Sequence, residues 1–269
     1  MTGLKASLKS TIPPSLWEAM RSAWYAAGRV RFLKAYLPGL LFDVFQKDYT
    51  TEGMSFAVPR HLTTRIHRAR FYWDTHEKDE RDLVRKHVPA DARVLELGAC
   101  LGVVSCVINR LLHTPAQHVA VEANPALAGI LNENRTRNRC AFAVEICMVS
   151  RTSDGTFYQN ECLVMSSGHM RQGKRIEVPV MSVEALEERH GFAFDTVFMD
   201  IQGGELEFMR ENRPLLDRCR LMILEVHPHI IGDAACEECR ALLTASGLRL
   251  QERRGLVEVW AAGRDSSHG

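Results

Sequence analysis

The chain lacks both a charge excess of one sign and a long hydrophobic run. Its 269 residues include 34 Lys and Arg against 33 Asp and Glu. There is therefore no overall field to attract a phosphate backbone, and we expect no nucleic-acid partner. No stretch reaches the roughly 20 apolar residues of a membrane span. Disordered and collagen-like chains are excluded as well, because 46% of the residues are hydrophobic and 25% are charged, as in an ordinary globular protein.

The sequence also carries no signal for export. Residues 1–14 lack the apolar stretch and the small-residue cleavage site of a signal peptide. Most of the eight cysteines fall inside apolar runs, where a reduced thiol packs as a small hydrophobe. Asn134-Arg135-Thr136 matches the glycosylation pattern, but it lies in a helix-like segment and we assign no modification to it. We therefore expect a cytoplasmic protein.

Charge is uneven only at the start of the chain. The first 47 residues carry seven basic side chains against two acidic ones, and apolar residues recur there at helical spacing: Leu16, Met20, Trp24 and Ala27. We expect residues 1–70 to form a basic, mainly helical extension. Its apolar face can pack on the main domain or on a second copy of the chain in a homo-oligomer. Alternatively, residues 15–47 can lie on an anionic membrane surface, where the protein would then be peripheral.

From Arg93 onward, strand-like and helix-like segments alternate. The apolar, strand-like runs are residues 93–97, 118–122, 143–149, 196–201 and 221–227. The helix-like segments are residues 102–112, 125–138, 182–189 and 205–216. Continuous apolar strands joined by helices predict an α/β fold whose parallel sheet is covered on both faces.

Two segments depart from this alternation. Residues 150–179 contain repeated turn signals, so we expect an inserted loop or hairpin over the sheet, of the kind that often forms part of a substrate site. Residues 248–253 and 256–261 are short strand candidates separated by Arg254-Gly255. A two-residue link suits a tight hairpin, so we expect the sheet to end with an antiparallel strand.

The most informative motif is the glycine turn between residues 94 and 105. An apolar strand ends there in Gly98 and Gly102, and a helix follows, so a ligand can approach backbone N–H groups at the start of the helix. The Gly-x-x-x-Gly spacing differs from the Gly-x-Gly-x-x-Gly of a dinucleotide fold and argues against a pyrophosphate site. Glu96, just before the turn, places a carboxylate where a cationic amine can be received. A tight turn that needs glycine for its backbone alone is the alternative.

A second motif lies at the end of the next strand. Glu122 follows Gly98 by 24 residues and precedes Asn124-Pro125. An acidic side chain at this place can accept both hydroxyls of a ribose, whereas an isolated acid at a strand end is often only a solvated cap. The two motifs together predict a nucleoside-bearing ligand.

Further polar residues follow two later strands: Asp200, Glu205, Glu225 and His227. Ligands of an open parallel sheet bind beyond the carboxyl ends of its strands, so we expect these side chains to converge on one crevice. Two alternatives concern single residues. Glu205 can be a favourable charge in the first turn of a helix, and His227 can be a satisfied imidazole at a strand end.

Two metal sites are conceivable, and we assign neither. A divalent cation on Asp200 and Glu225 is one alternative, since hard cations prefer oxygen ligands, but two carboxylates are too few to assign it. Zinc held by the histidines of His227-Pro228-His229 together with Cys236 and Cys239 is another. The two cysteines, however, are spaced to share one face of a predicted helix over residues 234–246.

These motifs together resemble the FkbM family of S-adenosylmethionine-dependent methyltransferases over about residues 71–262. The glycine turn of the family matches residues 96–102, its ribose-binding acid matches Glu122, and its Asp-x-x-Gly-x-Glu motif matches residues 200–205. Cys100 stands where an Asn is usual, and Gln202 where an acid is frequent. The resemblance implies a Rossmann-like class I methyltransferase domain over residues 71–269, with a seven-stranded, mostly parallel sheet and an antiparallel last strand.

The resemblance also implies what the residues do. S-adenosylmethionine is the expected cofactor, held by Glu96, Gly98, Cys100, Gly102, Glu122 and Asn124. Methyl transfer needs an aligned nucleophile and a group that accepts its proton, so we expect His227 or Asp200 to take the hydroxyl proton and Glu205 to orient the acceptor. The acceptor expected from the resemblance is a hydroxyl of a sugar, glycan or secondary metabolite. The alternative is a cofactor-binding or membrane-surface interaction protein without turnover.

Overall fold

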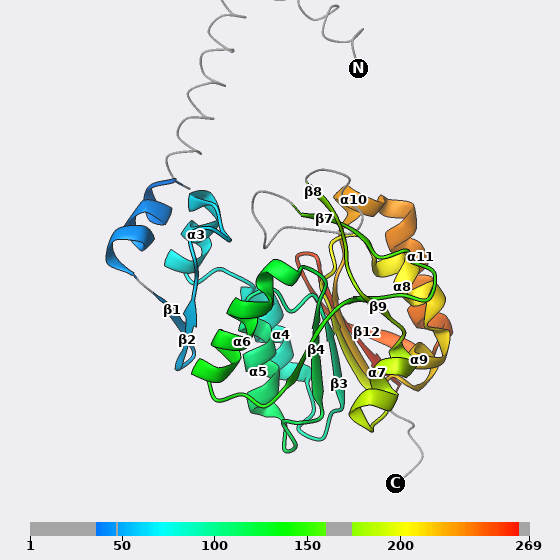
Figure 1. Cartoon of the computed structure of the whole chain (residues 1–269). Coiled ribbons are helices and arrows are strands. Elements are labelled where there is room, and N and C mark those ends of the chain that lie inside the picture. Colours follow the sequence, from blue (N-terminus) through cyan, green and yellow to red (C-terminus); the bar gives the residue numbers. More distant parts are fainter. Residues whose placement is uncertain (1–35, 47, 160–173, 264–269) are drawn as a thin grey trace, which may run out of the picture. The chain divides into compact units, whose positions relative to one another are not determined.

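A computed structural model describes residues 36–46, 48–159 and 174–263 (Figure 1). The helical pattern expected between Leu16 and Ala27, and the turn signals of residues 166–168 and 172–173, lie outside the described residues. Within the described ranges, no helix is long and apolar enough to cross a membrane.

The chain divides into two compact units. The first comprises residues up to 47 and residues 65–74, and the second comprises residues 48–64 and all residues from 75 onward. We expected one boundary after residue 70. The chain instead enters the second unit with a short hairpin, returns to the first for one helix, and then continues in the second.

The described part of the first unit consists of two helices. Residues 36–45 are helical, and the second helix is α3 (Arg65–Tyr72). The helices approach closely at Gly39, where an added Cβ would lie 1.9 Å from the carbonyl oxygen of Arg65. The buried carboxylate of Asp43 accepts hydrogen bonds from the Nε atoms of Arg65, at 3.0 Å, and Arg68, at 2.5 Å. Close backbone packing and ion pairs therefore both hold the two helices of this unit together.

The second unit is built on a seven-stranded sheet. Its strands are β3 (Val94–Leu97), β4 (His118–Glu122), β5 (Ala143–Ile146), β10 (Thr196–Met199), β11 (Leu221–Glu225), β12 (Leu248–Arg254) and β13 (Val257–Ala262), in the spatial order β12-β13-β11-β10-β3-β4-β5. All neighbours are parallel except the last strand, β13, which is antiparallel to both β11 and β12. The predicted mostly parallel sheet with an antiparallel last strand is thus confirmed.

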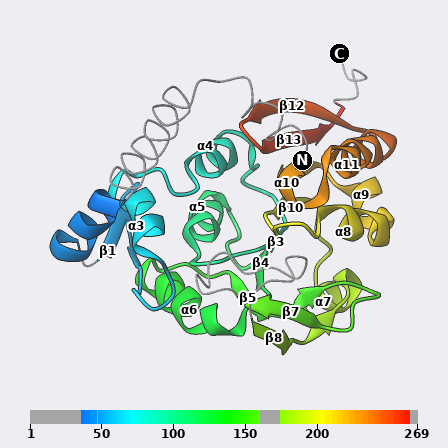
Figure 2. The same ribbon diagram turned by 90° about the horizontal axis from the view of Figure 1, so that it is seen from above.

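Helices cover both faces of this sheet. Their bounds are α4 (Lys78–His87), α5 (Val103–Leu111), the 3₁₀ turn η1 (Pro125–Leu127), α6 (Ala128–Arg137), α7 (Val183–His190), α8 (Glu205–Glu211), α9 (Arg213–Arg218), α10 (Pro228–Ile231) and α11 (Asp233–Ala245). Figures 1 and 2 show α4, α5 and α6 on one face and α7, α8, α9 and α11 on the other. The central strands β3, β4 and β10 are therefore buried at every position, as their continuous apolar sequences predict.

Shorter strands lie outside the main sheet. They are the hairpin of β1 (Asp48–Thr51) and β2 (Met54–Ala57), the parallel pair of β6 (Met148–Val149) and β9 (Val180–Met181), and the antiparallel pair of β7 (Thr156–Gln159) and β8 (Lys174–Glu177). The pair of β7 and β8 forms the described part of the insertion expected over residues 150–179.

Three predicted elements end elsewhere than expected. Residues 143–149 are not one strand, because β5 belongs to the main sheet whereas β6 pairs with β9. Residues 205–216 are two helices. Their break lies at Asn212, just before Pro214, whose missing N–H prevents a continuous helix. The turn of the last hairpin is Gly255-Leu256, since β12 continues to Arg254.

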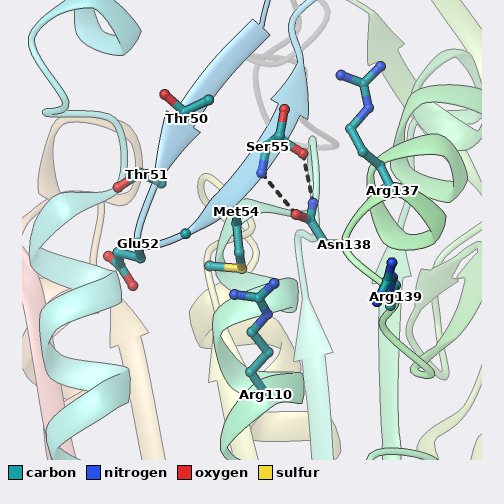
Figure 3. A pocket seen from close by; sticks show the side chains of 10 residues that line it. Thr50, Thr51, Glu52, Met54, Ser55, Arg110, Arg137, Asn138 and Arg139 are labelled. Carbon is teal, nitrogen blue, oxygen red and sulfur yellow. Dashed lines mark hydrogen bonds between the residues drawn. The ribbon is translucent and has the colours of Figure 1, made fainter.

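Two amides of the α6 region fasten the β1–β2 hairpin. Oδ1 of Asn134 accepts from the backbone N–H of Ala57 at 2.7 Å, and Nδ2 donates to the carbonyl of Leu101 at 2.9 Å. Nδ2 of Asn134 also donates to the carbonyl of Ala57 at 3.2 Å. Asn138 forms a reciprocal pair with the backbone of Ser55, with both distances 2.9 Å (Figure 3). The buried Asn134 thus connects the hairpin to the segment that carries the glycine turn.

The edge strand β12 is irregular and charged. Its register against β13 shifts between Leu250 and Glu252. Arg249 and Arg253 are exposed, while Glu252 accepts from Lys86 of α4 at 2.6 Å.

Candidate functional site

The glycine turn connects β3 to α5 at the carboxyl end of the sheet. Gly98 and Gly102 have φ angles of +88° and +81°, which L residues with a Cβ rarely adopt. The backbone N–H groups of Gly98 and Ala99 both donate to the carbonyl of Val121, at 2.9 and 3.0 Å. A Cβ on Gly98 would lie 1.8 Å from the carbonyl oxygen of Asp200. Glycine is therefore required because the turn lies directly against the loop after β10.

Glu122 joins this turn to the loop that follows β4. Its Oε2 accepts from the backbone N–H of Cys100 at 2.9 Å, and its Oε1 accepts from the backbone N–H of Asn124 at 2.7 Å. Burial raises the pKa of Glu122, while the backbone N–H groups of Asn124, Cys100 and Ala123 act against that rise. Each carboxylate oxygen can accept a second hydrogen bond. Glu122 can therefore still receive two hydroxyls at this place.

The side chains of Asn124 and Glu96 are buried and form hydrogen bonds with other residues of the protein. Oδ1 of Asn124 accepts from the N–H of Ala126 at 3.1 Å and so caps η1. Glu96 is 1% exposed. One of its oxygens accepts from the hydroxyl of Ser105, at 2.8 Å, and the other lies 2.9 Å from Nε2 of His118. Their contact with the cofactor stays a prediction, and in the structure both side chains bond to other parts of the protein.

Beyond β10 and β11, four side chains form what we call the acid–histidine cluster: Asp200, Glu205, Glu225 and His227. Nδ1 of His227 lies 2.7 Å from Oε1 of Glu205. Nε2 of the same ring lies 3.5 Å from Oδ1 of Asp200 and 3.5 Å from Oε2 of Glu225. The predicted convergence of these residues on one place is therefore seen in the structure.

The side chains of the acid–histidine cluster differ in their exposure to solvent. Glu205 is 0% exposed and also accepts from the N–H of Gly203 at 3.0 Å, so its contacts in the structure are with other parts of the protein, His227 among them. Asp200 and Glu225 are about one fifth exposed, at 19% and 22% of their side chains, and they form the accessible side of the cluster. The expectation that Glu205 orients the acceptor stays a prediction.

Burial and neighbouring charge act in opposite directions on the pKa of His227. Burial lowers its pKa, but the contacts with Glu205 and Glu225 and the charge of Asp200 outweigh burial and raise the pKa to about 10. Burial, reinforced by the charge of Glu225, raises the pKa of Asp200. The side chain of Asp200 is more exposed than that of His227, at 19% against 5%, so of the two bases expected from the sequence Asp200 is the more accessible to an acceptor.

A further acid at the start of α4 was not recognised in the sequence. Glu80 is buried, although the run from Glu77 to Glu80 has the composition of an exposed helix start. Burial, the neighbouring charge of Glu77 and the charge of Glu225 raise the pKa of Glu80 to about 7. Only the fold shows that this helix end faces the acid–histidine cluster.

Glu80 leads to a prediction about stability. Its pKa is about 7 in the folded protein and 4.5 in the unfolded chain. The folded state therefore holds the proton more tightly, and stability falls as the pH rises from 4.5 through 7. We expect Glu80→Gln to be more stable than the unchanged protein at pH 8, by at most about 3 kcal/mol, and nearly equal to it at pH 4. Urea unfolding at both pH values measures this. Glu188→Gln, at an exposed glutamate of α7, is the control, and a difference that does not change with pH would contradict the prediction.

The cysteines expected to be alternative zinc ligands lie in the core. Cys236 and Cys239 are on α11, with 2% and 0% exposure, and the described cysteines are free thiols. Over the described ranges, one group of three or more potential metal ligands comes together, and it consists of Asp200, Glu225 and His227.

A cavity of about 690 Å³ lies elsewhere in the second unit, beside the β1–β2 hairpin (Figure 3). Arg110, Arg137 and Arg139 line it together with residues 50–55 and Asn138. It includes none of the residues predicted for the site, so we do not place the cofactor there.

Comparison with known proteins agrees with the motifs. The model of the methyltransferase FkbM domain matches residues 96–250, which include the glycine turn, Glu122 and the acid–histidine cluster. No protein of curated function matches the chain.

Distant similarities in fold occur among solved structures. A precorrin-6y C5,15-methyltransferase from Geobacter metallireducens is 13% identical, with 77% of this chain and 93% of that chain covered and a TM-score of 0.44. Aeropyrum pernix fibrillarin with bound S-adenosyl-L-methionine is 12% identical, with 68% and 74% covered and a TM-score of 0.42. An O-methyltransferase from Bacillus cereus in complex with SAH is 15% identical, with 68% and 81% covered and a TM-score of 0.40.

Proposed function

Because the chain belongs to the FkbM family of methyltransferases, we propose that it transfers the methyl group of S-adenosylmethionine to a hydroxyl oxygen of a sugar, glycan or secondary metabolite. The observation that carries the proposal is the contact between Gly98 and Asp200. The turn that receives the methyl donor and the acid that faces the acceptor touch each other through the backbone. Donor and acceptor can therefore meet at one place.

The residues at the carboxyl end of the sheet fit the cofactor. The close approach of the turn needs a glycine at position 98, and Glu122 lies at the end of β4 with hydrogen-bonding capacity left for a ribose. When bound, S-adenosylmethionine supplies a methyl group already activated on a sulfonium. What the protein adds is alignment of the nucleophile, exclusion of water and acceptance of a proton.

The acid–histidine cluster supplies the proton acceptor. Asp200 is partly exposed and adjoins the glycine turn, so a hydroxyl bound against it can give its proton to the carboxylate. Oε1 of the buried Glu205 contacts Nδ1 of His227, and the opposite ring nitrogen, Nε2, lies beside the carboxylate of Asp200. Asp200 is thus the proposed base, and Glu205 and His227 are positioning residues.

Two substitutions separate cofactor binding from chemistry. We expect Glu122→Ala to weaken binding of S-adenosylmethionine tenfold or more, about 1.4 kcal/mol, because the ribose hydroxyls and two backbone N–H groups lose their acceptor. We expect Asp200→Asn to keep that binding and to lose methyl transfer by a factor of about 100 or more. Calorimetry measures the first. Formation of S-adenosylhomocysteine with a panel of hydroxyl compounds measures the second.

Glu188→Ala, on the exposed face of α7, is the control for both measurements. Absence of any binding of S-adenosylmethionine by the unchanged protein would overturn the proposal. Binding without transfer to any hydroxyl compound would favour a cofactor-binding protein without turnover.

A further inference from the structure

The acid–histidine cluster has the arrangement of a metal site. One ligand atom each from Asp200, Glu225 and His227 lies within 4.8 Å of the others, and both measured distances from Nε2 of His227 are 3.5 Å. That is longer than a good N–H···O hydrogen bond, which is typically 2.7–3.2 Å. Ligand atoms about 2.2 Å from a common ion, at angles near 90–110°, stand about 3 to 3.6 Å apart. The two separations from Nε2 of His227 fall in that range, and the two carboxylate oxygens lie within 4.8 Å of each other.

The surroundings of His227 support the same conclusion. Its Nδ1 is held by Oε1 of Glu205, which directs Nε2 toward Asp200 and Glu225. A ligating histidine commonly gives its other ring N–H to a carboxylate in this way, and that contact fixes the tautomer and the ring orientation. Because Glu205 is fully buried and also bound to the N–H of Gly203, the ring is held firmly.

A second, independent observation concerns unsatisfied oxygen atoms. Oδ1 of Asp200, the atom that faces Nε2 of His227, is shielded from solvent and has no hydrogen-bond partner among the described residues. Oε2 of Glu205 is in the same state. A buried carboxylate oxygen without a partner is costly. A cation between Asp200, Glu225 and His227 would satisfy the oxygen of Asp200.

We infer that Asp200, Glu225 and His227 bind one divalent cation of the Mn²⁺ type. Two carboxylates and one imidazole combine the oxygen ligands that hard cations prefer with the nitrogen ligand that later transition metals accept. The cation site deepens the proposed function and depends on it for its role, since the cation would lie where the acceptor hydroxyl approaches. The second oxygen of Asp200 stays available for the hydroxyl proton.

Titration of the full-length protein with Mn²⁺ alone, followed by the electron paramagnetic resonance signal of free Mn²⁺, tests the inference. We expect one ion per chain, with affinity at least tenfold weaker in His227→Gln and in Glu225→Gln and unchanged in Glu188→Gln. Thermal unfolding provides a second measurement: at saturating Mn²⁺ we expect the unfolding midpoint of the unchanged protein to rise by about 5 °C, with no such rise in His227→Gln.

Each outcome supports or contradicts the site. No saturable binding, or equal binding by the unchanged protein and both cluster variants, would overturn it. A variant that fails to fold leaves the stoichiometry and the midpoint shift of the unchanged protein as the decisive measurements. Calorimetry with S-adenosylmethionine in the presence of a chelator separates the two proposals. Cofactor binding without Mn²⁺ binding would leave the proposed methyl transfer standing and remove only the cation.

Discussion

Gly98→Ala is expected to abolish binding of S-adenosylmethionine and to lower the free energy of unfolding by about 3 to 5 kcal/mol. The new Cβ would lie 1.8 Å from the carbonyl oxygen of Asp200, a backbone atom that no side-chain rotation can move. The φ angle of +88° adds strain for any L residue with a Cβ. Relief requires the glycine turn and the loop after β10 to separate, which disturbs both the donor and the acceptor side of the site. Chemical unfolding and calorimetry measure the two effects.

Gly129→Ala is the matched control. Gly129 lies in α6, and an added Cβ there meets nothing within 4 Å. Alanine should therefore stabilise the helix by about 0.5–1 kcal/mol without affecting the cofactor. If Gly98→Ala unfolded like Gly129→Ala and still bound S-adenosylmethionine, the close approach described for the turn would be wrong.

Asn134→Ala is expected to lower the free energy of unfolding by about 3 kcal/mol, because three backbone groups lose their partner. These are the N–H and C=O of Ala57 and the C=O of Leu101, all of which bond to the buried amide. The β1–β2 hairpin should therefore loosen before the main sheet unfolds. Hydrogen exchange at the N–H of Ala57 reports this local opening, and urea unfolding gives the total.

Asn132→Ala, on the same helix, provides the comparison. The amide of Asn132 donates to the carbonyl of Ala128, within its own helix. Its loss should change the free energy of unfolding by no more than about 0.5 kcal/mol. Equal effects of the two substitutions would show that the bonds to the hairpin contribute nothing.

Much of the fold could be predicted because the central strands are buried on both faces. Continuous apolar runs such as residues 118–122 have few alternatives, and the helices between them determine that neighbouring strands are parallel. The missed elements are of another kind. The charged helix α4 and the short β1–β2 hairpin depend on partners distant in sequence, and the four-residue helix α10 is too short to give a periodic pattern.

The sequence predicts where the site lies, but it does not predict which of its side chains are buried and which are accessible. Residues at strand ends, such as Glu122 and Asp200, converge because parallel strands bring their carboxyl ends to one edge. Whether a carboxylate there faces the ligand or the interior depends on the pleat of the strand and on neighbours from other elements. Glu96 of β3 and Glu205 at the start of α8 are both buried, and each lies within hydrogen-bonding distance of a histidine, His118 and His227 respectively.

The irregular strand β12 affects whether sheets of different molecules can associate edge to edge. An edge strand offers unpaired backbone groups to which a strand from another molecule can add. The register shift between Leu250 and Glu252, together with the exposed charges of Arg249 and Arg253, makes this edge a poor template for such addition. Crowding many copies together should therefore not produce fibrils that grow from this side of the sheet.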